Sequence, residues 1–272
     1  MSEANRNERQ VIFGTGPLGQ SVMRALLDKG YTDICMVNRS GSRGEIPASV
    51  QVIASDAYDA AKVREVTQGA AVVYQCAQPG YTEWPEKFPP LQTAILEGTA
   101  ASGAKLIVGE NLYIYGDTNG KRLHEGLPYA PHGHKGRTRA AMAQQLLDAH
   151  KAGKVRVAMA RGSDFYGEAV LGSAIGDRVV KPLLQGKTAQ VFGDVDLPHT
   201  YTYIGDFGKA MVILGECDEA LGRAWHVPND QPEMTTRQLI EKIAAEIGVE
   251  PKVSAMPKLM FQVVALFHPY VK

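Results

Sequence analysis

Three glycines near the amino terminus have the spacing of a phosphate-binding turn. They form a Gly-x-Gly-x-x-Gly pattern directly after an apolar run at 11–13, and helical apolar spacing follows. In such a turn the first glycine permits a tight bend, the second lets backbone approach a pyrophosphate, and the third lets helix and strand pack closely. The N-terminus of the helix would face the anion. The pattern predicts a dinucleotide site, against the alternative of a ligand-free turn, at Gly14, Thr15, Gly16, Pro17, Leu18 and Gly19.

The end of the second apolar run favours one nucleotide over another. After residues 34–37 the chain has Asn38, Arg39 and Ser40, where an NAD site usually has an acidic residue for the ribose 2′-hydroxyl. Asn38 carries no charge to repel a phosphate, and Arg39 can pair with a 2′-phosphate in a bidentate manner. Arg43 is a second candidate cation. We therefore expect NADP(H) rather than NAD(H), unless both arginines are solvated loop charges.

The apolar periodicity predicts strands that alternate with helices. This alternation is typical of a Rossmann-type α/β fold, with a doubly wound parallel sheet and ligands at the carboxyl ends of its strands. Asp56, Ala77 and Gln78 follow the third and fourth strands, so we expect them near the cofactor. The expected strands are 11–13, 34–37, 50–54, 70–76, 105–108, 155–159 and 224–227, and the expected helices after the first are 60–66, 91–101, 139–150, 204–214 and 239–247.

The last third of the chain changes character. Residues 162–200 hold many glycines and few periodic segments, so we expect loops and short elements there. Thr235 or Thr236 is expected to cap the helix at 239–247, and 256–267 is a further apolar, helix-like segment. We predict a nucleotide-binding domain at 1–161, with 200–230 returning to it. A smaller substrate lobe would comprise 162–199 and 231–272.

Composition excludes several classes of partner. The 272 residues carry 29 lysines and arginines against 29 aspartates and glutamates, so no net field favours nucleic acid or an anionic membrane. The three cysteines lack metal-ligand spacing and fit a reducing cytoplasm. No stretch has the length and apolarity of a membrane span, and no signal peptide is evident. We expect a cytoplasmic protein without a bound metal.

Several ordered motifs resemble the short-chain dehydrogenase/reductase superfamily, in its extended branch of NAD(P)-dependent epimerases and dehydratases. Tyr-Ile-Tyr-Gly at 113–116 is similar to the segment that carries the family's catalytic serine. Arg-Gly-Ser-Asp-Phe-Tyr-Gly at 161–167 is similar to its substrate loop. Thr-Tyr-Thr-Tyr-Ile-Gly-Asp at 200–206 and Trp-His-Val-Pro-Asn at 225–229 match later landmarks. The resemblance spans nearly the whole chain and implies a nicotinamide cofactor and a small-molecule substrate.

The family's catalytic set is incomplete in this sequence. Those enzymes use a Tyr-x-x-x-Lys pair and an upstream serine or threonine. Asn111 stands at the serine position and Lys135 best matches the lysine, but Pro131 lies where the tyrosine is expected. The chain thus resembles the atypical members, whose catalytic set is degraded while the nucleotide site persists. Lys135 would bind the nicotinamide ribose, unless it is a solvated charge.

The proton for hydride transfer must then come from another residue, from a water or from the substrate's own environment. Asn111 could hydrogen-bond a carbonyl oxygen or only complete a turn. Tyr113 and Tyr81 could donate a proton or only pack, since both follow predicted strands. His134 could act as an acid near neutral pH, although lone loop histidines are often merely exposed.

The resemblance also implies substrate contacts and an assembly. Arg161, Asp164 and Tyr166 lie in the substrate-loop match, where Arg161 and Tyr166 could instead anchor the loop. The basic run 137–139 is expected to be a solvated helix start. The alanine-rich segment 140–147 matches a helix that often forms the family's dimer interface, so a homodimer is expected. Similar proteins usually continue past the last apolar segment, so we expect a truncated sequence or an open cleft.

Two classes of function remain open. The first is an NADP(H)-dependent oxidoreductase, or an epimerase/dehydratase-like enzyme that transiently oxidises its substrate, acting on a small carbonyl or hydroxyl compound such as a sugar derivative. The second is a non-catalytic NADP(H)-binding protein that senses the cofactor or regulates a partner. The missing Tyr-x-x-x-Lys pair favours the second class, and the retained substrate-loop residues favour the first.

Overall fold

The chain divides into two compact units, each with its own core. The structure is a computed structural model and describes residues 5–229 and 233–255. The larger unit comprises Met1–Gly162 and Gly205–Val227, and the smaller comprises Ser163–Ile204 and Pro228–Lys272. The substrate-binding role of the smaller unit stays a prediction.

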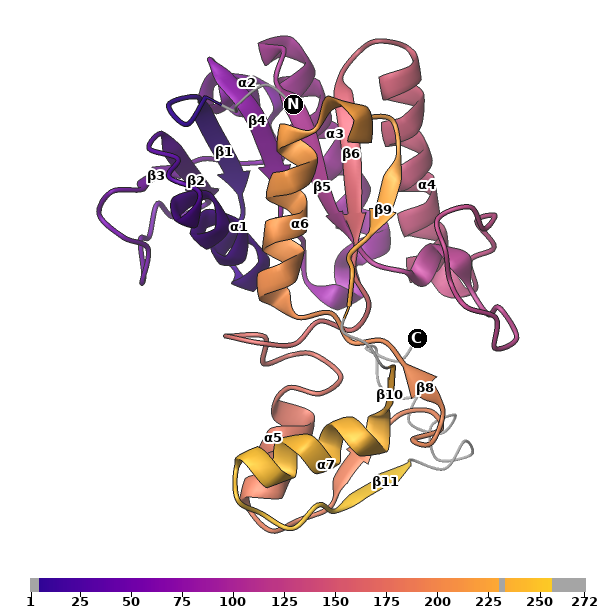
Figure 1. The fold of residues 1–272 in the computed structure, drawn as a ribbon. Coiled ribbons are helices and arrows are strands. Elements are labelled where there is room, and N and C mark those ends of the chain that lie inside the picture. The colour runs from indigo at the N-terminus through magenta and orange to yellow at the C-terminus, as the bar shows by residue number, and fades with distance from the viewer. Residues whose placement is uncertain (1–4, 230–232, 256–272) are drawn as a thin grey trace. The chain divides into compact units, whose positions relative to one another are not determined.

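A seven-stranded parallel sheet forms the centre of the larger unit (Figure 1). Its order is β3-β2-β1-β4-β5-β6-β9, so the direction of winding reverses between β1 and β4. Central strands are buried on both faces, which explains their near-continuous apolar sequences. The predicted doubly wound fold is confirmed. The strands are β1 Arg9–Phe13, β2 Ile34–Asn38, β3 Gln51–Ala54, β4 Ala70–Gln75, β5 Lys105–Glu110, β6 Arg156–Arg161 and β9 Ala224–His226.

Helices cover both faces of this sheet. Figure 1 shows α1 (Pro17–Asp28) and α6 (Ile204–Glu216) in front, where they approach closely: a Cβ placed on Gly208 of α6 would lie 2.2 Å from Ser21 Oγ of α1. The short 3₁₀ turn η3, Asp218–Ala220, follows α6. The opposite face packs one continuous apolar core beneath α2 (Ala60–Thr67), α3 (Trp84–Ser102) and α4 (Gly133–Lys151).

Two helices begin earlier than the sequence predicts. Helix α3 begins at Trp84 rather than residue 91 and contains Pro89 and Pro90. Prolines remove backbone donors, but Trp84 and Phe88 are 5% and 4% exposed, so burial of this first part offsets the lost hydrogen bonds. Helix α4 begins at Gly133 rather than residue 139. The segment with Lys135 is therefore helical.

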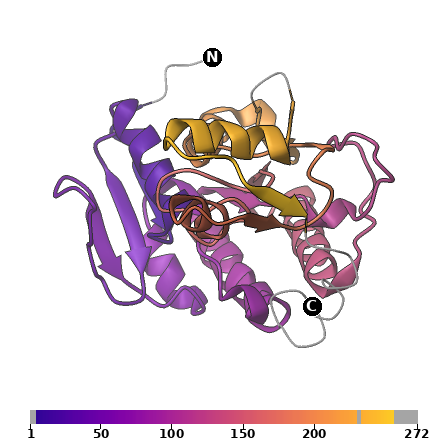
Figure 2. The same cartoon turned by 90° about the horizontal axis from the view of Figure 1, so that it is seen from below.

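The smaller unit packs two helices against short strands. Residues 162–200, expected to be loops and short elements, include the eight-residue helix α5. A capping box at Thr235 begins α7, because its side chain accepts from Gln238 N and Gln238 caps in return. Figure 2 shows α7 and β11 at the yellow end of the colour scale. The expected segment 256–267 lies outside the described residues. The elements are α5 Asp177–Leu184, β7 Ala189–Val191, β8 Pro198–His199, β10 Met234–Thr235, α7 Thr236–Glu246 and β11 Val253–Ala255.

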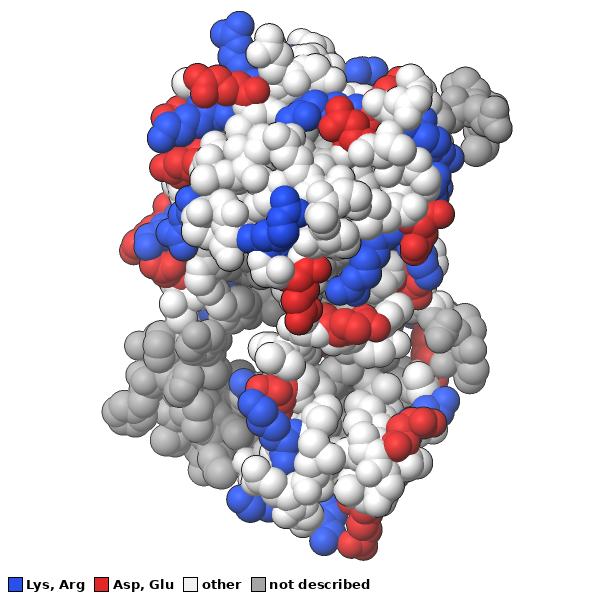
Figure 3. Space-filling model, turned by 90° about the vertical axis from the view of Figure 1, so that its left-hand side faces the viewer, with Lys and Arg blue, Asp and Glu red and all other residues white. Residues whose placement is uncertain are grey.

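The surface carries charges of both signs. Figure 3 shows lysines and arginines interspersed with aspartates and glutamates over one face. Among the helices of the described residues, none combines the length and apolarity that crossing a membrane requires.

Candidate functional site

The turn between β1 and α1 is closed to side chains at two of its three glycines. Gly14 has φ +105°, and a Cβ there would lie 2.8 Å from the backbone nitrogen of Ala77. A Cβ on Gly19 would lie 2.0 Å from the carbonyl oxygen of Gly14. Both positions therefore exclude a side chain.

Gly16 shows the opposite environment at the start of α1. A Cβ there would meet nothing within 4 Å, and no described side chain caps this helix N-terminus, where Pro17 begins the helix. Uncapped N–H groups and the helix dipole make such an open surface suitable for a phosphate. The residues present thus fit the pyrophosphate of a dinucleotide. The side chain of Leu18 lies against β5, because its Cδ2 would be 2.6 Å from a Cβ placed on Gly109 of that strand.

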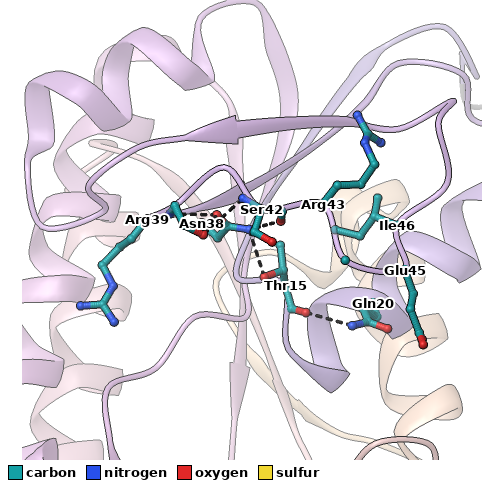
Figure 4. Close-up of a pocket in the computed structure, with 10 residues that line it drawn as sticks. Thr15, Gln20, Asn38, Arg39, Ser42, Arg43, Glu45 and Ile46 are labelled. Carbon is teal, nitrogen blue, oxygen red and sulfur yellow. Dashed lines mark hydrogen bonds between the residues drawn. The ribbon is translucent and has the colours of Figure 1, made fainter.

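A cavity of about 400 Å³ lies at the carboxyl ends of β1 and β2 (Figure 4). Small-molecule sites commonly have volumes of about 300–1,000 Å³. The cavity joins the glycine turn to the loop that follows β2. Its lining residues are Thr15, Gln20, Asn38, Arg39, Ser40, Ser42, Arg43, Gly44, Glu45 and Ile46.

Asn38 holds the floor of this cavity together. Its amide nitrogen donates to Thr15 Oγ1 at 3.3 Å and to the Ser42 carbonyl oxygen at 2.8 Å. Its amide oxygen accepts from the backbone nitrogens of Ser40 at 3.1 Å and Gly41 at 2.6 Å. Asn38 therefore links the glycine turn to the β2 loop without adding a charge.

The two arginines of this loop, Arg39 and Arg43, point in different directions (Figure 4). Arg43 Nη1 donates to the carbonyl oxygens of Pro47 and Val50, both at 2.7 Å, so this nitrogen fixes the loop. Arg43 also lines the cavity, and its help in binding a phosphate stays a prediction. Arg39 extends on the side opposite Arg43 in Figure 4. The pairing of Arg39 with a phosphate stays a prediction. The carboxylate of Glu45 lines the same cavity.

The ends of β3 and β4 complete the edge where a dinucleotide would lie. Asp56 Oδ1 accepts from Tyr58 N at 3.0 Å, which makes Asp56 a turn-former in this structure. Ala77 abuts Gly14, so the segment after β4 meets the glycine turn. Gln78 is exposed beside it. Ligands of doubly wound sheets bind at this reversal of strand order.

Three candidate residues gather with one further aromatic residue beyond this turn. We call them the tyrosine cluster: Tyr81, Tyr113 and Lys135, together with Trp84. Tyr81 lies in the 3₁₀ turn η1 (Tyr81–Glu83) after β4, and Tyr113 in η2 (Tyr113–Tyr115) after β5. Their hydroxyl oxygens are 2.9 Å apart, and Lys135 Nζ lies 4.2 Å from the centre of the Tyr81 ring. The Trp84 ring packs 5.0 Å from Tyr81 and 6.1 Å from Tyr113.

The remaining catalytic candidates lie at the edges of this cluster. Asn111 Oδ1 accepts from Tyr113 N at 3.1 Å, so it supports η2 and presents its amide group as the donor. Partial burial lowers the pKa of Lys135. His134 is exposed on the first turn of α4. Trp84 was not among the sequence candidates, and its position after a glycine- and proline-rich turn was the available signal.

A second group, the buried charge cluster, lies at the ends of β5 and β6 and consists of Glu110, Tyr115, Tyr129, Arg139 and Arg161. Arg161 donates to Glu110 Oε2 at 2.9 Å and to the hydroxyls of Tyr115 and Tyr129, both at 2.7 Å. Arg139 Nη2 donates to Glu110 Oε1 at 3.3 Å. Glu110 is 2% exposed, and Arg139 and Arg161 are 2% and 1% exposed.

This cluster corrects one expectation and bears on a second, the substrate role of Arg161, which stays a prediction. Arg139 is not part of a solvated helix start, because Glu110 neutralises it inside the core. Arg161 was a substrate candidate, but its burial and its bonds to three side chains favour the alternative in which it anchors the segment. Burial opposes its charge, yet Glu110 and these hydrogen bonds raise the pKa of Arg161 above the usual value. The sequence signal for this cluster was Glu110, a charged residue at the end of the apolar strand β5.

The smaller unit holds the other two substrate candidates. Asp164 has φ +27° and its Oδ2 lies 2.6 Å from His199 Nε2. Tyr166 pairs with Tyr203 through a backbone bridge, and their rings are 5.6 Å apart. His199, which sequence reasoning missed, also packs 4.6 Å from the Tyr201 ring. Whether these residues contact a substrate stays a prediction.

This architecture matches one known family. The model of the NAD-dependent epimerase/dehydratase family covers residues 11–227, and the chain belongs to that family. Its members are epimerases and dehydratases, and the resemblance carried by the motifs is thereby confirmed. Curated protein sequences show no match to this chain.

Solved structures of such enzymes share the fold. UDP-glucose 4-epimerase from Thermus thermophilus, in complex with NAD, is 20% identical, with a TM-score of 0.75 over 90% of this chain and 85% of that one. dTDP-glucose 4,6-dehydratase from Streptomyces venezuelae, with NAD bound, is 17% identical, with a TM-score of 0.78 over 91% and 84%. UDP-glucuronic acid 4-epimerase from Bacillus cereus, in complex with UDP-glucuronic acid and NAD, is 19% identical, with a TM-score of 0.76 over 91% and 86%.

Proposed function

We propose that this protein is an NADP(H)-dependent oxidoreductase or epimerase/dehydratase-like enzyme for a small carbonyl or hydroxyl compound. The observation that carries the proposal is the glycine turn, which is closed to side chains at Gly14 and Gly19 and open at Gly16. The adjoining cavity supplies space for the adenosine end of a dinucleotide. The matched enzymes are named for sugar nucleotides, and the Bacillus cereus structure holds UDP-glucuronic acid, which favours a sugar-derived substrate.

The residues of the larger unit divide the binding of the cofactor among them. Backbone N–H groups at the start of α1 would hold the pyrophosphate, and Arg39 would pair with the 2′-phosphate. Asn38 would shape the ribose site without repelling that phosphate. Lys135 would hold hydroxyls of the second ribose. The bound nicotinamide supplies hydride transfer at its C4 atom, while the protein positions and polarises the substrate.

Cofactor preference tests the role of Arg39. Calorimetry should show tighter binding of NADPH than of NADH, and Arg39→Ala should remove about 1.5–3 kcal/mol from the NADPH interaction alone, because one charge-assisted contact is lost. Arg64→Ala, on the exposed side of α2, is the matched control. Equal affinity of the wild type for both nucleotides would refute the NADP(H) assignment.

The glycine turn is tested separately. Gly16→Val should abolish binding of both dinucleotides, because its side chain fills the space that the pyrophosphate needs. The fold should persist, since the backbone of Gly16 has φ −75° and its surroundings are open. Gly172→Val, at another open position, should bind normally. A folded Gly16→Val protein with normal affinity would place the phosphate site elsewhere.

A non-catalytic NADP(H) sensor is the second candidate, favoured by Pro131 at the position expected for the family's tyrosine. Nicotinamide absorbance followed with a panel of carbonyl compounds and nucleotide sugars separates the two. Turnover of any compound establishes an enzyme. Tight NADPH binding without turnover supports the sensor. The homodimer expected from residues 140–147 remains part of the proposal and is tested by sedimentation.

A further inference from the structure

We propose that Tyr81 and Tyr113 form a proton-transfer pair, and that Lys135 stabilises the negative charge that proton transfer leaves on Tyr81. The inference rests on the proposed oxidoreductase function and assigns the proton donor of that site. It gives the chain a substitute for the missing Tyr-x-x-x-Lys pair, built from three separate segments. Both arrangements place a phenol beside a cation.

The pair lies where a proton is needed. Tyr81 is four residues beyond Ala77, which abuts Gly14 of the phosphate-binding turn. Tyr113 follows β5, the neighbour of β4 in the sheet. The carboxyl ends of these parallel strands form one edge, so both hydroxyls stand at the edge where ligands of this fold bind.

The exposure of the rings also fits the role. Tyr113 is 40% exposed, so solvent can exchange protons with it. Tyr81 is partly buried, and Trp84, which is 5% exposed, packs against both rings and holds their orientation. The 2.9 Å separation between the hydroxyl oxygens allows a proton to pass from one phenol to the other.

The proton and electron balance is simple for carbonyl reduction. A bound reduced nicotinamide would supply the hydride to the carbonyl carbon and would itself be oxidised, and the π electron pair of the C=O bond would move to the oxygen. That oxygen takes the Tyr81 hydroxyl proton, whose O–H bond pair stays on Tyr81 as phenolate. Tyr113 passes its own proton to Tyr81 and regains one from solvent. Oxidation of an alcohol runs through the same steps in reverse.

Lys135 favours this transfer through the ring of Tyr81. A cation 4.2 Å from the ring centre is attracted to the π face, and the attraction grows when the phenol becomes a phenolate. Asn111 can hydrogen-bond the substrate oxygen but cannot give up a proton at neutral pH. His134 lies on the same first turn of α4 and is exposed.

The test begins with the protein free of cofactor, so it does not depend on turnover. 3-Fluorotyrosine placed at position 81 reports ionisation of that phenol by ¹⁹F NMR. Lys135→Met should move the titration midpoint to higher pH by about half a unit or more, since the stabilising cation is lost. Tyr113→Phe should also raise it, because the phenolate loses a hydrogen-bond donor. Lys135→Arg should preserve the midpoint, and Lys151→Met at the far end of α4 is the control. An unchanged midpoint in folded Lys135→Met overturns the proposal.

The activity arm distinguishes this failure from failure of the proposed function. Tyr81→Phe should lower kcat by about 10²–10⁴-fold, as expected for loss of a general acid. Its affinity for NADPH should stay within about twofold, because Tyr81 is not assigned to nucleotide binding. Unchanged kcat in Tyr81→Phe overturns the proton-transfer pair. A wild type that binds no dinucleotide refutes the proposed function instead.

Discussion

The tyrosine cluster and the buried charge cluster start from neighbouring residues but reach opposite environments. Glu110 ends β5 inside the core, while Asn111, the next residue, supports the turn on which Tyr113 is exposed. On α4, Lys135 lies beside the Tyr81 ring, and Arg139, one turn later, is 2% exposed. Each cluster thus takes one cation from α4 and one segment from the end of β5.

The two clusters differ in the groups that interact with their charged side chains. In the buried charge cluster, Glu110 is shared by two arginines, and two tyrosine hydroxyls accept from Arg161. In the tyrosine cluster, the cation meets an aromatic face and the hydroxyls face each other at an exposed position. Charges satisfied within the protein give structure, and charges left partly solvated can respond to a ligand. Four predictions, each made with a substitution, test this division.

The largest effect is expected at Glu110. Glu110→Gln keeps the shape of the side chain but leaves two buried guanidinium groups without their carboxylate. Such a loss typically costs about 3–5 kcal/mol. Urea denaturation of the variant should show this decrease in the free energy of unfolding.

A surface pair supplies the matched control for Glu110. Glu97→Gln removes the partner of Lys154, where both side chains are more than 40% exposed, and should cost less than about 1 kcal/mol. If Glu110→Gln costs no more than Glu97→Gln, the buried cluster does not stabilise the sheet as described.

The two tyrosine pairs should respond differently to loss of a hydroxyl. Tyr129→Phe removes an acceptor from buried Arg161 and should destabilise the fold by about 1.5–3 kcal/mol, the range for hydrogen bonds to charged groups. Tyr113→Phe removes a solvent-exposed hydroxyl and should lower the free energy of unfolding by less than about 0.5 kcal/mol. Thermal unfolding of both variants measures the contrast. Similar losses of stability would erase the distinction between the clusters.

A smaller effect is expected from pH at the border of the buried cluster. His226 Nε2 lies 2.8 Å from the Tyr115 hydroxyl, and burial lowers the pKa of His226, with Glu125 opposing that shift and Arg161 and His124 adding to it. In the interval below the ordinary value of 6.5, the unfolded chain therefore binds more protons at this residue than the folded chain. The stabilisation is fully present above pH 6.5 and is lost as pH falls through the folded pKa.

Removal of His226 should reveal that contribution. His226→Gln should flatten the decrease in stability between pH 6.5 and pH 5, whereas His134→Gln, at an exposed histidine, should keep the wild-type slope. Denaturation midpoints at a series of pH values give the comparison. Parallel slopes for the wild type and His226→Gln would contradict the assignment to His226.

The sheet could be predicted from the sequence because its strands are buried on both faces. Their apolar runs need no tertiary information, and the glycine turn identifies the carboxyl end of β1. The start of α3 could not be predicted this way. Pro89 and Pro90 indicate a break, and only the burial of Trp84 and Phe88 explains why the helix includes them.

The two clusters show the same limit for side chains. Lys135 and Arg139 both lie in the basic first part of α4, and nothing in the local sequence distinguishes them. The partner that buries Arg139 is Glu110, 29 residues away in sequence. Likewise, sequence could place Tyr81 and Tyr113 after two strands, but the 2.9 Å between their hydroxyls depends on the pairing of β4 with β5.

A small effect on stability is expected at Lys135, in contrast to the buried charge cluster. Because burial lowers the pKa of Lys135, the unfolded chain holds this proton more tightly, and the charge works slightly against folding at neutral pH. Lys135→Met loses a cation–π contact of about 0.5–1 kcal/mol, but it also removes the cost of partly burying a charge. The free energy of unfolding should therefore change by less than about 1 kcal/mol. Urea denaturation at pH 7 measures it. A loss above about 2 kcal/mol would show that Lys135 is structural, and the contrast with Arg139 on the same helix would then disappear.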